Sequence, residues 1–204
     1  MQVNSLNLPS KNFPVVSFCG GNFIVREAKN YSEKLKINRK MENALIEEFY
    51  RINQLMLPKC IKKFFIKIEN LFNILTTPFF SIKQKDVVGV FDEQGNIHGG
   101  FLGFKSMKRY QVYGLFLDEK IKRTKHSPIV LKSILEKIKT LAENKKMKII
   151  SCEAYKQARS TIRLYQKAGF KETKYRDIYS PTITLHADIA ELGKNIEFCK
   201  KIKK

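Results

Sequence analysis

The residues best suited to chemistry in this chain begin with a short basic loop before a helix start. Lys122, Arg123, Lys125 and His126 directly precede Ser127, where the apolar spacing of an amphipathic helix begins. The first N–H groups of a helix lack intrahelical partners and carry the positive end of the helix dipole, so they favour an anion. Basic side chains at that end would be repelled by the positive end of the helix dipole unless an anion binds between them. The loop is therefore either a solvated charged loop or a phosphate-binding site.

The cysteines and histidines give no comparable pattern. Cys19, Cys60, Cys152 and Cys199 lie far apart without a CxxC pair, and the three histidines are equally scattered. This spacing argues against a zinc site and provides no disulfide framework. We therefore expect no metal, and reduced, mostly buried thiols of the kind found in cytoplasmic proteins.

The segments before the loop predict strands and helices that must position it. Apolar residues at spacings of three and four predict helices over 41–57 and 61–75, with Leu45, Phe49, Ile52 and Met56 on the buried face of the first. A strand is expected at 23–28. Three further strands, joined by short connections and by the turn DEQGN at 92–96, form an antiparallel meander at 86–91, 97–104 and 109–117.

The segments after the loop alternate between helix and strand. Ser127 is a good N-cap and Pro128 a good first helical residue. The buried face of this helix is expected to comprise Leu131, Ile134, Leu135, Ile138 and Leu141. A strand at 147–154, a helix at 157–168 with Gly169 as its C′ residue, strands at 170–179 and 182–189, and a short helix in the tail 191–204 complete the order. The pattern predicts an α/β fold.

This order resembles that of the GNAT superfamily of N-acetyltransferases. The most specific match is ARSTIRLYQKAGFKET at 158–173, where Tyr165, Gly169 and Phe170 stand in the places of the family's Tyr-x-x-x-Gly-Phe. The second match, at 115–135, falls where the family binds the pyrophosphate of acetyl-CoA. The resemblance covers roughly residues 80 to 190 and extends to about residue 23. It implies a central mixed, mostly antiparallel sheet flanked by helices, with a splayed strand pair for acetyl-CoA.

The resemblance also implies roles for individual residues. Tyr165 would donate a proton to the departing thiolate, and a backbone N–H near Leu117 would stabilise the oxygen that gains charge. Transfer would be direct, so Cys152 is expected to be structural rather than a nucleophile. The implied acetyl-CoA contacts are Phe116, Leu117, Lys122, Arg123, Thr124, Lys125, His126, Ser127 and Ser160.

Several positions depart from the family pattern. Lys125 and Ser127 stand where the family's loop has glycines, and Ala158 stands where relatives often have an asparagine that contacts pantetheine. The strand at 110–117 has no acidic residue, although many relatives carry a glutamate there. The general base is therefore open among Glu153, Tyr113, Asp118 and His98, a water relay, or an amine that arrives neutral.

The amino-acid composition limits the kinds of molecule that the protein could bind. The 39 Lys and Arg against 19 Asp and Glu give a net charge of +20, a field that attracts nucleic acid, acidic surfaces or phosphorylated ligands. The N-terminal sequence does not resemble a secretory signal, and no apolar run is long enough for a membrane span, so we expect a cytoplasmic protein without a membrane partner. We expect an N-terminal extension over 1–22, a catalytic domain over 23–190 and a basic tail over 191–204.

Three classes of function follow from these observations, of which one is transfer from an acyl donor other than acetyl-CoA, because nothing in the sequence measures the acyl pocket. The first is transfer of an acetyl group from acetyl-CoA to an amine, whose acceptor is unknown and could be RNA-linked or a protein on the ribosome. The alternative is a non-catalytic GNAT-like module that binds nucleic acid or a protein partner through its basic surface. The oligomeric state is open.

Overall fold

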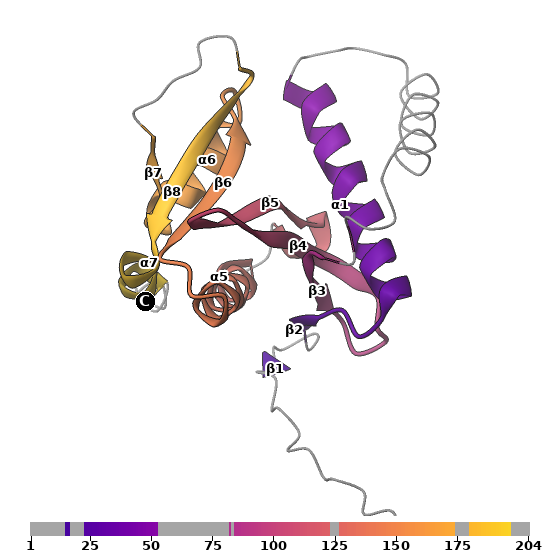
Figure 1. Cartoon of the computed structure of the whole chain (residues 1–204). Helices are drawn as coiled ribbons and strands as arrows, with labels where there is room; N and C mark the ends of the chain where they lie inside the picture. Colours follow the sequence, from indigo (N-terminus) through magenta and orange to yellow (C-terminus); the bar gives the residue numbers. More distant parts are fainter. Residues whose placement is uncertain are drawn as a thin grey trace, which may run out of the picture.

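The centre of the molecule is a mixed eight-stranded sheet (Figure 1). The computed structural model describes residues 15–16, 23–52, 82, 84–122, 127–173 and 180–196. The strand order is β1-β2-β3-β4-β5-β6-β8-β7, and every neighbouring pair is antiparallel except β5 and β6. The strands are β1 Val15–Val16, β2 Phe23–Glu27, β3 Asp86–Phe91, β4 Ile97–Ser106, β5 Arg109–Leu117, β6 Ile149–Tyr155, β7 Lys171–Glu172 and β8 Thr182–Asp188. The predicted fold class is confirmed.

The meander β3–β4–β5 lies where the sequence predicted it. Gly95 has a φ of 80°, which the turn between β3 and β4 requires and which glycine adopts without strain. Strand β4 runs to Ser106, two residues beyond the predicted end at 104, because Ser106 still pairs with Arg109. The strand at 170–179 is described as β7 at Lys171–Glu172, and residues 174–179 lie outside the described part.

One face of the sheet is covered by α1 (Tyr31–Ile52), which packs on β3, β4 and β5. The predicted helix over 41–57 is thus correct in type, but its predicted start was wrong. Asn30 caps the helix, because its side-chain oxygen accepts the Glu33 N–H at 2.9 Å while a Glu33 carboxylate oxygen accepts the Lys29 N–H at 2.7 Å. The pattern Asn30-Tyr-Ser-Glu33 is a capping signal that the periodicity argument overlooked.

The buried stripe of α1 also differs from the prediction. Ile37 and Met41 are fully buried against the sheet, whereas Phe49 is 39% exposed. The Phe49 ring instead approaches Tyr155 at the end of β6, with ring centroids 6.0 Å apart. The 3–4 spacing predicts Phe49 in the core, but this spacing does not register which strands lie beneath each turn of the helix. The second predicted helix, at 61–75, lies outside the described residues.

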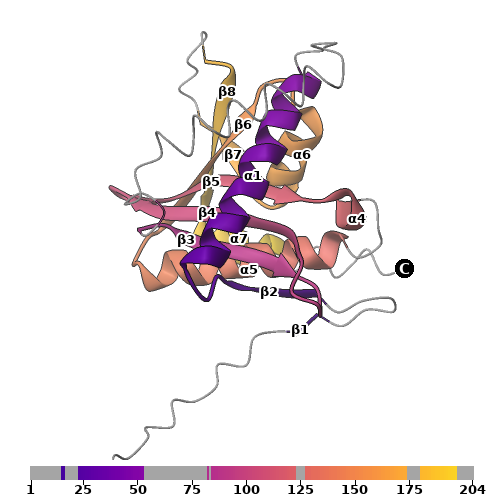
Figure 2. The ribbon, with the colours of Figure 1, turned by 90° about the vertical axis from the view of Figure 1, so that its right-hand side faces the viewer.

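The opposite face is covered by α5 (Ser127–Asn144), α6 (Arg159–Lys167) and α7 (Ile189–Ile196), which share one hydrophobic core (Figure 2). All five residues predicted for the buried face of α5 are buried: Leu131, Ile134, Leu135, Ile138 and Leu141. Helix α7 begins at Ile189 rather than at 191, because Asp188 at the end of β8 accepts the Ala190 N–H. No helix in the described part of the chain is long and apolar enough to cross a membrane.

Candidate active site

Strands β5 and β6 lie side by side at one end and separate at the other. They pair in parallel from Arg109 with Ile149 to Val112 with Cys152. Beyond this point β5 continues to Leu117 beside β4 alone, and β6 continues to Tyr155 beside β8 alone. Figure 1 shows the two strands running in different directions from this apex. The splayed strand pair that the resemblance implied is therefore present.

Backbone N–H groups of β5 face the space between the two strands. In an antiparallel pair, hydrogen-bonded and non-hydrogen-bonded residues alternate. The Asp118 N–H donates to the His98 carbonyl at 2.8 Å, so Phe116 and Gly114 also bond toward β4. The N–H groups of Leu115 and Leu117 consequently point the other way. Among the described residues no strand pairs with this edge, so both groups can donate to a ligand held between β5 and β6.

A β-bulge at Tyr113 stands where the strands begin to separate. Leu102 pairs with Gly114 and Gly103 pairs with Val112, which leaves Tyr113 without an opposite residue on β4. Bulges increase local twist and bend the strand, and this one turns β5 away from β6 at the apex. The Tyr113 side chain is 53% exposed, and the Lys85 ammonium lies 5.2 Å from its ring centroid.

The motif around Tyr165 forms the end of α6. Gly169 has a φ of 100°, its N–H donates to the Gln166 carbonyl at 3.0 Å, and the Phe170 N–H donates to the Tyr165 carbonyl at 3.0 Å. These two bonds define a Schellman motif, in which the residues at the places of Tyr165 and Phe170 also make an apolar contact. Their rings meet edge to face at 5.3 Å. The spacing Tyr-x-x-x-Gly-Phe is thus explained by helix termination, and it fixes the Tyr165 ring.

The Tyr165 hydroxyl is buried near the apex. The side chain is 7% exposed, and burial raises the pKa of the hydroxyl well above its ordinary value, with a further contribution from Cys152, the last residue of β6 that pairs with β5. The hydroxyl therefore remains protonated at neutral pH. It forms no hydrogen bond with any residue that the structure describes. A buried hydroxyl normally has a hydrogen-bond partner, so this hydroxyl is available to a ligand that reaches it.

The other predicted catalytic and binding residues lie around this space. Glu153 is exposed on β6, one residue beyond the apex, and Ser160 is exposed in the first turn of α6. Phe116 and Leu117 are buried on opposite faces of β5. Cys152 is buried, and burial raises the pKa of its thiol, which keeps it protonated and agrees with a structural role.

The basic loop falls mostly outside the described residues. Lys122 ends α4 (Glu119–Lys122), but its side chain and the whole of Arg123, Thr124, Lys125 and His126 are not described. Helix α5 begins at Ser127, one residue before the predicted first helical residue Pro128, so the helix N-terminus directly follows the loop in the sequence. The diphosphate contacts of the loop stay a prediction.

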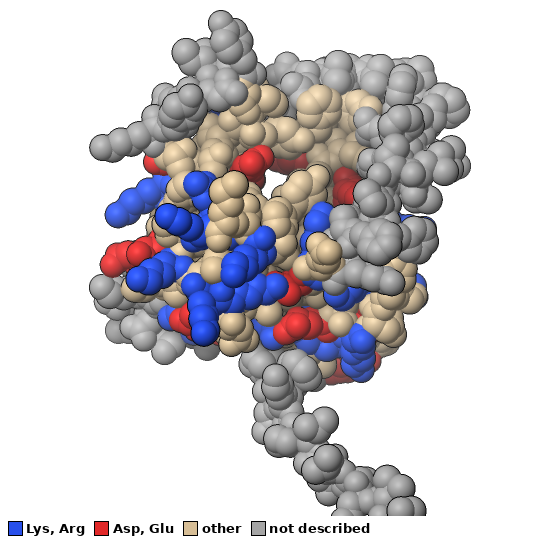
Figure 3. Space-filling view, in the orientation of Figure 1, with Lys and Arg blue, Asp and Glu red and all other residues tan. Residues whose placement is uncertain are grey.

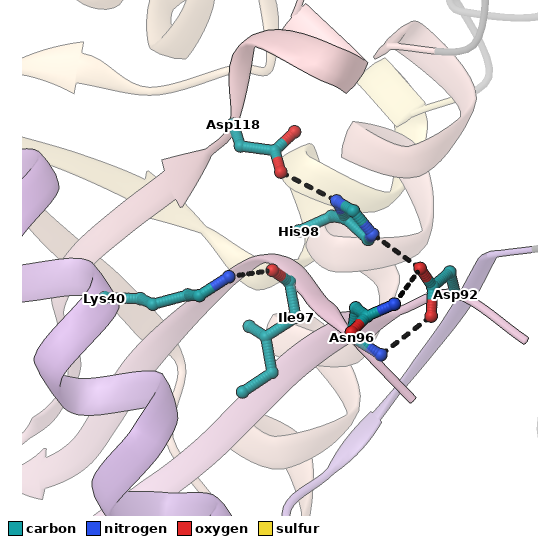
Figure 4. A network of polar contacts seen from close by, with 6 residues as sticks. All are labelled: Lys40, Asp92, Asn96, Ile97, His98 and Asp118. Carbon is teal, nitrogen blue, oxygen red and sulfur yellow. Dashed lines mark hydrogen bonds and ion pairs between the residues drawn. The ribbon is translucent and has the colours of Figure 1, made fainter. Parts of the chain in front are cut away.

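A polar network that the sequence analysis did not recognise lies under the end of β5 (Figure 4). His98 contacts Asp118 through Nδ1 at 2.7 Å and Asp92 through Nε2 at 2.8 Å. Asp92 is also bound by the Asn96 backbone and side chain. Both ring nitrogens of His98 are therefore engaged by carboxylates within this network rather than left to contact a substrate amine. In the sequence these are three polar residues at the ends of predicted strands, and nothing local shows that the strand register brings them together.

The face between the two halves of the molecule is hollowed. Figure 3 shows the hollow, with acidic side chains on its rim and basic side chains gathered below it. The exposed Glu153 comes from β6, and the contact between Phe49 and Tyr155 joins α1 to the end of the same strand. A molecule that enters between α1 and β6 would therefore meet a carboxylate and aromatic rings.

Comparisons with known proteins identify the fold. No protein-family model and no curated protein matches the chain. Among solved structures, a GNAT-family acetyltransferase of Staphylococcus aureus is 14% identical with a TM-score of 0.57, covering 82% of this chain and 99% of its own. PaiA N-acetyltransferase of Thermoplasma acidophilum, solved in complex with coenzyme A, is 14% identical with a TM-score of 0.55 over 80% and 98%. An acetyltransferase of Streptococcus agalactiae is 14% identical with a TM-score of 0.53 over 81% and 98%.

The chain therefore has the fold of the GNAT acetyltransferases, and the resemblance seen in its sequence is confirmed at that level. At such identities the similarity concerns the fold alone. What the molecule does must be argued from its own residues.

Proposed function

We propose that this protein is an acetyl-CoA-dependent N-acyltransferase that moves an acetyl group directly to an amine. The observation that carries the proposal is the separation of β5 from β6 beyond Val112 and Cys152. It exposes two backbone donors on one side of a gap, with a buried hydroxyl at its apex that no described residue binds. The fold similarity to PaiA, solved with coenzyme A, supports acetyl-CoA as the co-substrate.

The backbone donors provide the electrostatic part of catalysis. As the amine nitrogen attacks the thioester carbon, the carbonyl oxygen gains negative charge. The N–H groups of Leu117 and Leu115 are fixed by the pairing of β5 with β4 before any substrate arrives. Donors that need no rearrangement stabilise such an oxygen effectively, and one oxyanion donor is typically worth about 10²–10³ in rate.

Tyr165 acts on the leaving group. When the carbon–sulfur bond breaks, the electron pair goes to sulfur, and the new thiolate needs a hydrogen-bond or proton donor. The raised pKa of Tyr165 keeps its proton available, and the Schellman motif holds the ring in place. We assign Tyr165 as this donor.

Glu153 is the best-placed acceptor for the proton that the amine must lose. It is exposed, lies next to the apex residue Cys152, and shares its face of the sheet with Ser151 rather than with the core. Tyr113 is a second candidate because it is exposed at the bulge, although its ring already lies beside Lys85. A base on β6 would compensate for the absence of an acid on β5.

The N-terminus of α5 and the basic loop before it are proposed to hold the coenzyme diphosphate. Lys122, Arg123 and Lys125 supply charge-assisted contacts, and Ser127 supplies a small hydroxyl at the helix start. Together they replace the close backbone approach that glycines give in relatives. Thr124, His126 and, on α6, Ser160 are proposed as further polar contacts to the coenzyme.

Binding and turnover test this proposal in sequence. Calorimetry with acetyl-CoA should give saturable binding, and acetyl-CoA should raise the melting temperature. Release of the coenzyme thiol should then depend on an added primary amine, from a panel of alkylamines, polyamines and peptides with free N-termini. Absence of acetyl-CoA binding at millimolar concentration would refute the proposal and favour the non-catalytic alternative. Binding without amine-dependent release across the panel would leave a coenzyme-binding module.

A further inference from the structure

His98 occupies a β-bulge that turns its ring toward the end of β5. The register between β3 and β4 shifts after Val90, and His98 is the residue left without an opposite partner on β3. On its other side its carbonyl accepts the Asp118 N–H at 2.8 Å. The side chain is nearly buried and packs edge-on against Phe23, with ring centroids 5.6 Å apart. Bulges redirect side chains, and this one places an imidazole between two strand ends.

The ring connects two carboxylates that belong to different strand ends. Asp118 follows β5 and lies 2.7 Å from Nδ1, and Asp92 follows β3 and lies 2.8 Å from Nε2 (Figure 4). Each carboxylate is within hydrogen-bond distance of a different ring nitrogen, so the imidazole bridges the two strand ends. Charge-assisted bonds of this kind are stronger than neutral ones. Asp92 is itself anchored in the turn by Asn96.

This network is attached to the backbone segment that carries the proposed oxyanion donor. Asp118 directly follows Leu117, whose N–H points into the gap. Beyond Val112 β5 no longer pairs with β6, and among the described strands β4 alone pairs with its backbone there. The bond from His98 to Asp118 is a further attachment, which ties this end of β5 to the β3–β4 turn.

We propose that His98 is a positioning residue, which fixes the Leu117 N–H in the gap by holding Asp118. The inference rests on the proposed function and adds to it a residue that touches neither the coenzyme nor the amine. A structural role alone would lower stability. A positioning role would in addition lower kcat, because a displacement of about 1 Å in a catalytic group can cost about 10²-fold.

The chain offers a matched control on the neighbouring residue. The Lys40 ammonium of α1 donates to the Ile97 carbonyl at 2.6 Å, so Lys40→Met also removes a side-chain bond to the start of β4. It leaves the link between His98 and Asp118 intact. His98→Phe keeps a ring in the bulge but removes both bonds. His98→Gln, a milder change, retains one amide donor in case the first variant does not fold.

The experiment compares these variants with wild type by amide NMR and by turnover. In His98→Phe and His98→Gln we expect shifted or broadened Leu117 and Asp118 amide signals and Asp118 hydrogen exchange at least tenfold faster. We further expect kcat about 10- to 100-fold lower, with acetyl-CoA affinity within threefold of wild type. Lys40→Met should lower the melting temperature without these changes.

The outcomes separate the inference from the proposed function. If the His98 variants resemble Lys40→Met in both readouts, the positioning role is refuted even though the enzyme works. If wild type neither binds acetyl-CoA nor turns it over, the proposed function fails, and the Leu117 and Asp118 amide signals still decide whether His98 holds the end of β5. Amide changes accompanied by an unaltered kcat would also refute the role in transfer.

Discussion

At the scale of single residues, Tyr165 combines a structural task with a proposed chemical one. Its carbonyl accepts the bond that closes the Schellman motif, and its ring packs on Phe170. Its hydroxyl takes no part in either contact. Ring and hydroxyl can therefore be separated by substitution.

Tyr165→Phe should lower kcat by about 10²–10⁴-fold, the usual range for loss of a general acid, and leave the KM for acetyl-CoA nearly constant. The free energy of unfolding should change little, because the hydroxyl has no hydrogen-bond partner among the described residues. Steady-state kinetics and a urea melt measure the two effects. A variant with full activity would refute the role of Tyr165 as a proton donor and leave it a purely structural residue.

The Leu117 N–H can be tested by a pair of substitutions at one position. Leu117→Pro and Leu117→Ala both shorten a buried side chain, but proline alone removes the N–H that faces the gap. This N–H does not bond to β4, so the ladder itself is spared. We expect kcat to fall about 10²–10³-fold further in the proline variant than in the alanine variant. Equal kcat values, normalised to folded protein, would exclude Leu117 as an oxyanion donor.

At the scale of elements, the start of α1 is stabilised by an ion pair that depends on pH. Arg26 binds Glu33 through both terminal nitrogens, at 2.8 and 3.0 Å, and stacks on the Phe91 ring. The side-chain hydrogen bond from Arg26 is the main reason why the pKa of Glu33 is lowered from 4.5 to about 2. The unfolded chain therefore binds more protons than the folded one between these two pKa values.

Stability from Glu33 should be complete above about pH 4.5 and be lost as the pH falls toward 2. Urea midpoints of wild type and Glu33→Gln between pH 6 and pH 2.5 measure this. The variant should be less stable at pH 6, and the difference should shrink at pH 2.5. A difference that is constant across this range would mean that the ionised carboxylate contributes nothing. The pKa of Asp92 is also lowered, to about 2, because hydrogen bonds from His98 and Asn96 outweigh the raising effect of burial. Its contribution to the pH dependence of stability should be the same in wild type and in Glu33→Gln, so it cancels in the difference.

The loop before α5 can be tested against a control of equal charge. Changing Lys122, Arg123 and Lys125 to Ala should weaken acetyl-CoA binding at least tenfold, since each charge-assisted contact contributes about 1.5–3 kcal/mol. The control changes three exposed lysines away from the gap, Lys105, Lys108 and Lys146. Calorimetry at one salt concentration should show a loss in the loop variant that the control does not share. Equal losses would mean that the general field, rather than the loop, attracts the coenzyme.

At the scale of the whole molecule, we expect the protein to bind RNA weakly and with strong salt dependence, because its net charge is +20. Basic side chains gather on the face shown in Figure 3, below the hollow. A labelled single-stranded RNA should lose at least tenfold in affinity between 50 and 200 mM salt, within the range that several phosphate contacts give. Deletion of residues 197–204, the part of the basic tail that follows α7, tests its contribution to binding. Salt-independent binding would exclude an electrostatic origin.

Local patterns in the sequence predicted most of the fold. Gly95 marked the β3–β4 turn, the 3–4 spacing of α5 marked its buried face, and Gly169 marked the end of α6, because each depends on neighbours a few residues away. The Tyr165 motif could be recognised for the same reason. The start of α1 was also encoded locally, in Asn30 and Glu33, and was missed because periodicity alone does not register a cap.

The geometry of the site was decided by the tertiary structure. The bulges at Tyr113 and His98 arise from shifts in the register between neighbouring strands. The sequence of one strand alone does not predict which of its residues will lack an opposite partner. The same holds for the point where β5 leaves β6, and for the meeting of Asp92, His98 and Asp118. Phe49 shows the converse, since its spacing fits the core but its side chain is partly exposed beside Tyr155. Sequence alone determined which elements form and which residues carry reactive groups, whereas strand register, a non-local property, decided which backbone donors face the gap.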